Sequence, residues 1–141
     1  MSNAYTERFS EVVIPLARIQ VGAHLGGISS EWVSLADFHR AAVIVDCGNM
    51  ASALQVTLWE STDAAGTGVS YITGKVAALT SDDDNDHVII ELRSEELTPG
   101  CRYVRVQTAN AGAANTYGVA LYGLVPRFAP VSTDNWDEVV G

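Results

Sequence analysis

The sequence predicts an all-β protein: a single β-sandwich, of the jelly-roll or immunoglobulin-like kind, with extended N- and C-terminal arms. Three observations lead to this fold class. Apolar and polar residues alternate with a period of two along several short segments, as in strands that bury one face. Turn-forming residues separate these segments at short intervals. The chain has 141 residues, of which 48% are hydrophobic and 18% charged. This is enough apolar material for one hydrophobic core that needs no disulfide or metal ion to hold it together.

The strand pattern recurs in seven segments. They are residues 31–35, 42–47, 53–60, 69–79, 88–93, 103–107 and 117–125. Within 53–60, Leu54, Val56 and Leu58 share one face, and Trp59 lies on the opposite face. Residues 97–106 have the spacing of a tyrosine corner, which keeps the immunoglobulin-like alternative open.

Glycines mark turns between and within these segments. Gly66 and Gly68 enclose a single threonine, and we expect this element to be a turn that needs positive φ. Gly74 and Lys75 interrupt residues 69–79, which predicts a turn or bulge joining two strands.

The acidic stretch at residues 81–86 resembles the start of a calcium loop, because carboxylates stand at alternate positions. His87 and Arg93, however, occupy the places where that loop needs glycine and glutamate. A solvated hairpin turn, in which Asp and Asn side chains bond to their own backbone, is the favoured interpretation. No metal site is predicted.

Apolar residues at both ends lack clean alternation, and prolines interrupt them. The sequence therefore predicts an N-terminal arm at residues 1–20, a sandwich at 21–125 and a C-terminal arm at 126–141. Such arms pack either on their own domain or on a neighbouring subunit. The protein-interface candidates in the arms are Phe9, Val12, Ile14, Leu16, Phe128, Val131 and Trp136.

Composition excludes some partners. The formal net charge is −9, from 17 acidic and 8 basic residues without a basic run, which disfavours nucleic acid and anionic membranes. No segment has the length of a membrane span or the apolar core of a secretory signal, so synthesis in the host cytoplasm is expected. Cys47 and Cys101 are interpreted as free thiols, although a disulfide between them stays possible.

No motif predicts catalysis or a cofactor. His24, His39 and His87 are far apart and form no zinc signature, and no nucleophile accompanies them. We therefore expect a protein that is not an enzyme and holds no cofactor.

Three aromatic residues are possible exposed contacts. Trp32, Trp59 and Tyr71 could form a platform for a sugar or a base. The alternative is burial beneath an arm or at a contact between subunits.

Two segments carry a family resemblance. The first is SLADFHRAAVIVDCGNM from Ser34, continued by LQVTLWESTDAAGTG from Leu54 and by ITGK from Ile72. The second is DHVIIELRSEEL from Asp86, continued by YVRV from Tyr103. Over residues 9–125 the chain resembles the capsid decoration, or cement, proteins of tailed phages and prophages.

The resemblance implies a structural virion protein on the outer surface of the capsid. Its partner would be the major capsid protein, and it would be a homo-oligomer, often a trimer at local three-fold points. Two other functions stay open from the sequence: a carbohydrate- or receptor-binding module of a head or tail fibre, and a head–tail joining or tail component.

Overall fold

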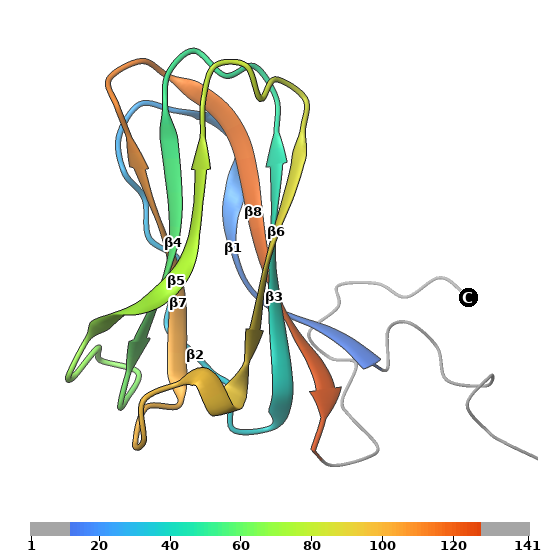
Figure 1. Ribbon diagram of the computed structural model, residues 1–141, viewed down its shortest axis with the longest axis vertical. Coiled ribbons are helices and arrows are strands. Elements are labelled where there is room, and N and C mark those ends of the chain that lie inside the picture. Colours follow the sequence, from blue (N-terminus) through green and yellow to red (C-terminus); the bar gives the residue numbers. More distant parts are fainter. Residues whose placement is uncertain (1–11, 128–141) are drawn as a thin grey trace, which may run out of the picture.

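The computed structural model describes residues 12–127, which form two four-stranded antiparallel sheets packed face to face (Figure 1). The strands are β1 (Val13–His24), β2 (Val33–Ser34), β3 (Phe38–Cys47), β4 (Leu54–Ser61), β5 (Ser70–Leu79), β6 (His87–Arg93), β7 (Tyr103–Asn110) and β8 (Asn115–Pro126), and a short 3-10 helix, η2 (Ser94–Glu96), follows β6. The predicted β-sandwich is confirmed, and all seven predicted strand segments overlap strands.

The order of the strands selects the jelly roll from the two predicted kinds of sandwich. One sheet has the order β1-β8-β3-β6 and the other the order β2-β7-β4-β5. The pairs β4–β5, β3–β6, β2–β7 and β1–β8 are nested, like a long hairpin rolled up on itself. An immunoglobulin-like sandwich places its strands in a different order, whereas eight strands in two sheets with nested pairing form a jelly roll.

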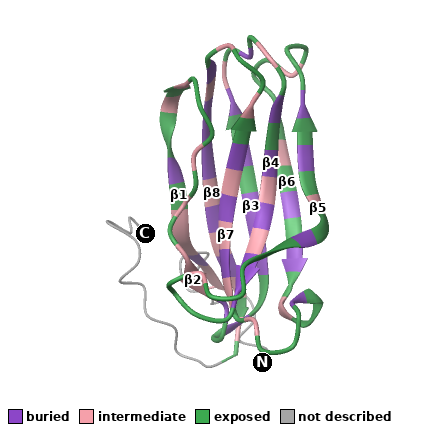
Figure 2. Cartoon of the chain, turned by 90° about the vertical axis from the view of Figure 1, so that its left-hand side faces the viewer, coloured by how far each residue is buried: buried purple, intermediate pink, exposed green. Residues whose placement is uncertain are grey.

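The core lies between the two sheets and follows the predicted alternation. Leu54, Val56 and Leu58 of β4 are each 0% exposed, as are Val43 and Val45 of β3. Figure 2 shows the same alternation along β4 and β7, where buried positions alternate with intermediate or exposed ones. Because each buried side chain of this size stabilises the fold by about 1.5–3 kcal/mol, this inner layer fixes which residues face outward.

The first strand begins earlier than the sequence predicted. Residues 13–20, assigned to the N-terminal arm, are the first part of β1 and pair with β8. Ile14 and Ile19 are both buried although five positions apart, because the register shifts between them, from Pro15 to Ala17. A second shift follows between Ile19 and Gly22. These bulges break the period-two pattern, so the alternation that marks a strand is absent from the sequence. Residues 1–11 lie outside the described residues.

The glycine predictions hold in part. Gly66 and Gly68 have φ values of 84° and 66°, as expected for the turn between β4 and β5. Gly74, at φ 80°, is a bulge within β5, which is one continuous strand rather than two.

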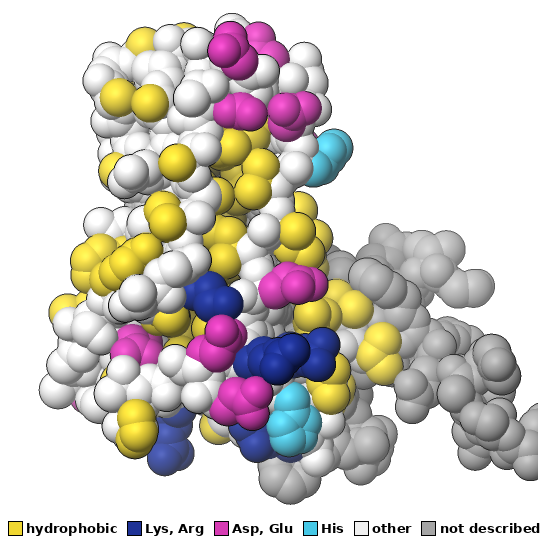
Figure 3. All heavy atoms as spheres, in the orientation of Figure 1, with side chains coloured by type: hydrophobic (Ala, Val, Ile, Leu, Met, Phe, Trp, Pro, Cys, Tyr) yellow, Lys and Arg dark blue, Asp and Glu magenta, His cyan; other side chains and the backbone are white. Residues whose placement is uncertain are grey.

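The acidic stretch connects the two sheets and is therefore not a hairpin turn, because β5 and β6 belong to different sheets. Its side chains bond to the backbone as predicted. Asp83 Oδ2 accepts hydrogen bonds from the Thr80 backbone N–H, at 2.6 Å, and from the Thr80 hydroxyl, while Asp84 Oδ1 accepts one from the Met50 N–H at 2.5 Å. Acidic side chains gather at this end of the molecule (Figure 3).

Candidate functional site

The outer face of the sheet β1-β8-β3-β6 carries an apolar outer patch, formed by Val21, Ile44, Ile89 and Ala120. Ile44 of β3 pairs directly with Ile89 of β6 and with Ala120 of β8, so the three lie in one row across three strands. Side chains directly opposite each other in antiparallel strands have Cβ atoms about 5 Å apart. Ile44 is 37% exposed and Ile89 is 57% exposed.

Val21 extends the apolar outer patch over β8. A Cβ added to Gly118 would lie 2.4 Å from Val21 Cγ2, so the valine occupies the space that a side chain there would fill. Val21 itself is 72% exposed and lies within the second register shift of β1, between Ile19 and Gly22. The bulge and the glycine together therefore place a large apolar side chain on the outside of the sheet.

Polar groups border this patch. His87 Nε2 lies 3.4 Å from Asp46 Oδ1 at the start of β6, and both side chains are largely exposed. Arg18 and Glu91 are exposed at neighbouring strand positions. An exposed apolar centre with a polar border is typical of a surface that binds another protein.

The predicted arm residues fall into two groups. Ile14 is 2% exposed and buried within its own subunit, while Leu16 packs on the core and Val12 is half-buried. Ile14 is therefore a structural residue of β1 rather than a surface for a partner. The other four candidates, Phe9, Phe128, Val131 and Trp136, lie outside the described residues.

The opposite outer face, on the sheet β2-β7-β4-β5, carries the predicted aromatic residues. Trp59 of β4 pairs with Tyr71 of β5 on one side and with Arg105 of β7 on the other. The rings of Trp59 and Tyr71 meet edge to face, with centroids 5.9 Å apart. The Arg105 guanidinium carbon lies 4.6 Å from the ring centre of Trp32. Sequence reasoning named the three aromatic residues but missed Arg105, which the strand register places between them.

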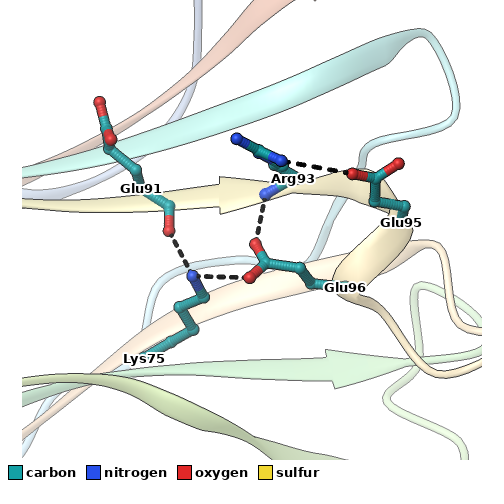
Figure 4. A network of polar contacts seen from close by, with 5 residues as sticks. All are labelled: Lys75, Glu91, Arg93, Glu95 and Glu96. Atoms are coloured by element: carbon teal, nitrogen blue, oxygen red, sulfur yellow. Dashed lines mark hydrogen bonds and ion pairs between the residues drawn. The ribbon is translucent and has the colours of Figure 1, made fainter.

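A charged groove of about 360 Å³ opens at the edge between β5 and β6 (Figure 4). Lys75, the sole lysine, joins the two sheets there: its Nζ donates to the Glu91 carbonyl oxygen at 2.8 Å and lies 3.1 Å from Glu96 Oε1. Glu96 also accepts a hydrogen bond from the Arg93 backbone N–H at 2.7 Å. That hydrogen bond first, and Lys75 second, lower the pKa of Glu96. Lys75 thus has partners within the chain, as does Arg93, whose Nη1 lies 3.7 Å from Glu95 Oε1, which indicates a structural role for these two cations.

Cys47 and Cys101 do not pair with each other. Cys47 is buried and Cys101 half-buried, and both are free thiols, as interpreted from the sequence. Burial, and in second place the Asp83 carboxylate, raise the pKa of the Cys47 thiol. Within residues 12–127, no three His, Cys, Asp or Glu side chains come together as a metal-binding group. The same residues contain no helix that is long and apolar enough to cross a membrane.

No family model and no curated protein matches the sequence. Among solved structures, the SPBc2 prophage-derived protein YomS is 8% identical with a TM-score of 0.47, over 77% of this chain and 92% of that chain. A chain of the native virion of Kashmir bee virus is 9% identical with a TM-score of 0.47, over 93% and 80%. The xylan-binding domain of CBM 22 is 12% identical with a TM-score of 0.40, over 79% and 86%. At these TM-scores the likenesses carry no weight for function, and the fold class follows from the strand order.

Proposed function

We propose that this protein is a capsid decoration protein, which binds the outside of a tailed-phage capsid and stabilises it. The observation that carries the proposal is the apolar outer patch, because a lone soluble chain gains nothing from exposing Val21, Ile44 and Ile89 together. The resemblance of the sequence to decoration proteins implies that the partner is the major capsid protein. The net charge of −9 disfavours packaged DNA as a competing ligand.

The stabilisation follows from mass action. A protein that binds only the assembled shell lowers the free energy of the shell relative to its separate subunits. Burying one large aliphatic side chain contributes about 1.5–3 kcal/mol, so a patch with three of them supports moderate affinity at each site. A homo-oligomer, which we propose to be a trimer, multiplies that affinity because several copies bind the shell together.

Binding to assembled shells tests the proposal. Purified protein is sedimented with shells assembled from the major capsid protein of the phage or prophage that encodes this chain, and in parallel with unassembled capsid subunits. We expect binding to the shells only, and at least tenfold weaker binding of Ile89→Glu, since burying the new carboxylate on the partner is costly. Val76→Glu is the matched control, because Val76 is 41% exposed on the opposite sheet.

Two results would contradict the proposal. One is equal binding to subunits and shells, which would remove the link to the assembled lattice. The other is full shell binding by Ile89→Glu, which would remove the apolar outer patch as the contact. The molar mass of the free protein, measured by light scattering, tests whether it is a trimer. A closed ring of many copies would instead support the head–tail joining alternative.

A further inference from the structure

We propose that the outer face of the sheet β2-β7-β4-β5 is a carbohydrate-binding surface, separate from the apolar outer patch. Its contact residues are an aromatic row, defined as Tyr71, Trp59, Arg105 and Trp32. The ligand class is a polysaccharide chain whose sugar rings stack on the aromatic side chains while its hydroxyls bond to Arg105 and to neighbouring amides. The proposed shell binding does not involve this face.

The strand register places the four side chains of the aromatic row in a line. Tyr71, Trp59 and Arg105 are direct cross-strand neighbours on β5, β4 and β7, and Trp32, just before β2, continues the line beyond Arg105. Three strand spacings of about 4.8 Å give the row a length of roughly 14 Å. This length exceeds one sugar ring and fits a short stretch of a chain, and Figure 2 looks onto this face.

Local contacts hold the rings in place before any ligand binds. The Trp59 indole N–H donates to Thr57 Oγ1 at 2.9 Å. A Cβ added to Gly66 would lie 2.9 Å from Trp32 Nε1, so the glycine turn lies against the edge of that indole. Rings that are already ordered lose little freedom on binding, which favours affinity on an open face.

The charge on this face matches a hydroxyl-rich ligand. Although the chain has a net charge of −9, the outward positions of β4, β5 and β7 contain no acidic residue. These positions are Gln55, Thr57, Trp59, Tyr71, Thr73, Val76, Ala78, Tyr103, Arg105, Gln107 and Ala109. The face thus combines aromatic rings with amides and hydroxyls, the groups that bind the apolar faces and the hydroxyls of sugars.

Arg105 has hydrogen-bonding capacity to spare. Within the described residues it forms no ion pair, and Nη2 donates to Gln107 Oε1 at 3.3 Å. Its Nε is buried, so a ligand would bond to the terminal nitrogens of the guanidinium. A nucleic-acid strand would need several cations along its path, and this face offers one. Tryptophan, tyrosine and arginine are also enriched at protein–protein contacts, so shell binding by variants of the aromatic row is measured beside polysaccharide binding.

Affinity gel electrophoresis tests the inference with gels that contain xylan, galactomannan, mixed-linkage β-glucan or dextran. We expect at least one polymer to retard the wild type, and Trp59→Ala and Tyr71→Ala to weaken that binding about tenfold or more, through the loss of a stacking ring. Trp59→Phe keeps a ring and should retain part of the retardation. Leu25→Ala, at an exposed aliphatic residue after β1 that belongs to neither proposed surface, is the matched control and should run as the wild type does.

The outcomes separate this inference from its rivals. A wild type that none of the four polymers retards, or equal retardation of wild type and Tyr71→Ala, would overturn it. Thermal unfolding of each variant shows whether a loss reflects unfolding, and Tyr71→Ala is the safer variant because Tyr71 is 37% exposed. Weaker shell binding by Trp59→Ala, without polysaccharide binding by the wild type, would assign the face to a protein partner and overturn the inference.

Discussion

Replacing Glu60 tests how the loop after η2 is attached to the sandwich. Glu60 is 3% exposed at the end of β4, with its carboxylate on the inner side of the sheet. The Thr98 backbone N–H donates to Oε2 at 2.9 Å, and the hydroxyl of Ser70 donates to Oε1 at 3.1 Å. The Thr98 hydroxyl donates to the same Oε1. One carboxylate thus connects β4, the start of β5 and the loop before β7.

The expected cost of Glu60→Ala follows from these three hydrogen bonds. A hydrogen bond to a charged group contributes about 1.5–3 kcal/mol, but Ser70 and Thr98 are exposed residues whose hydroxyls can turn to water. We therefore expect a loss of about 2–4 kcal/mol in the free energy of unfolding. For a chain of this size that lowers the Tm by roughly 5–15 °C. Glu60→Gln keeps an oxygen for the Thr98 N–H and should cost about 1 kcal/mol.

Urea unfolding followed by tryptophan fluorescence measures both variants, and trypsin cleavage at Arg93 and Arg102 reports on the loop itself. We expect faster cleavage in Glu60→Ala at urea concentrations where the wild type stays folded. If the free energy of unfolding of Glu60→Ala lies within about 1 kcal/mol of the wild-type value, the reasoning is refuted. Water would then replace each hydrogen bond to the Glu60 carboxylate at no cost. Equal losses in the Ala and Gln variants would show that the charge, not the geometry, is what matters.

Three further predictions concern the edges of the sandwich. Lys75→Met should lower stability by about 1 kcal/mol in thermal unfolding, because it removes the ammonium group that joins β5 to β6 and η2. Glu96→Gln should destabilise at pH 7, and its effect should fade as the pH falls below 4.5 and through the lowered pKa of the folded state. A lowered pKa of Glu96 means stability that is present above its ordinary value of 4.5 and lost as the pH falls through the folded value. Asn115→Ala should cost about 3 kcal/mol in urea unfolding, since the buried Oδ1 accepts from the Ala51 and Ser52 N–H groups at 2.8 and 3.0 Å.

Local pattern was sufficient to predict the inner layer of the sandwich. Apolar and polar residues alternate along a strand that has one buried and one outer face, so the sequence predicted Leu54, Val56 and Leu58 as core residues. The strand β1 was missed because a register shift between Pro15 and Ala17 places Ile14 and Ile19 on the inside at an odd spacing, and a second shift follows Ile19. A bulge depends on how two strands pair, and it interrupts the period-two alternation of apolar residues by which a strand is predicted from sequence.

The candidate sites depend on register between distant segments, which a single sequence does not contain. Trp59 and Tyr71 were named as surface aromatics, but their alignment with Arg105 needs the pairing of β4 with both β5 and β7. Ile44 is also ambiguous in sequence, because its apolar run fits a strand buried on both faces equally well. The exposure of Ile44 emerges only when the sheet forms without a third layer. Ile89, by contrast, alternates with Val88 and Ile90 and shares the exposed face of Glu91 and Arg93.

The two proposed surfaces lie on opposite outer faces of one sandwich, and this arrangement has a consequence for the assembled particle. Sheets in a sandwich lie about 10 Å apart, so a copy that contacts a shell through Ile44 and Ile89 points its aromatic row toward solvent. Shells coated with wild-type protein should then sediment with the polysaccharide that retards the free protein. The binding should be far tighter than that of one copy, because many copies act together. A coat of Trp59→Ala should still form and yet fail to sediment with the polymer, whereas Ile89→Glu should bind the polymer and fail to form a coat. If saturating polysaccharide instead releases the wild-type coat from the shell, the two ligands compete for one face, and the assignment of separate faces is wrong.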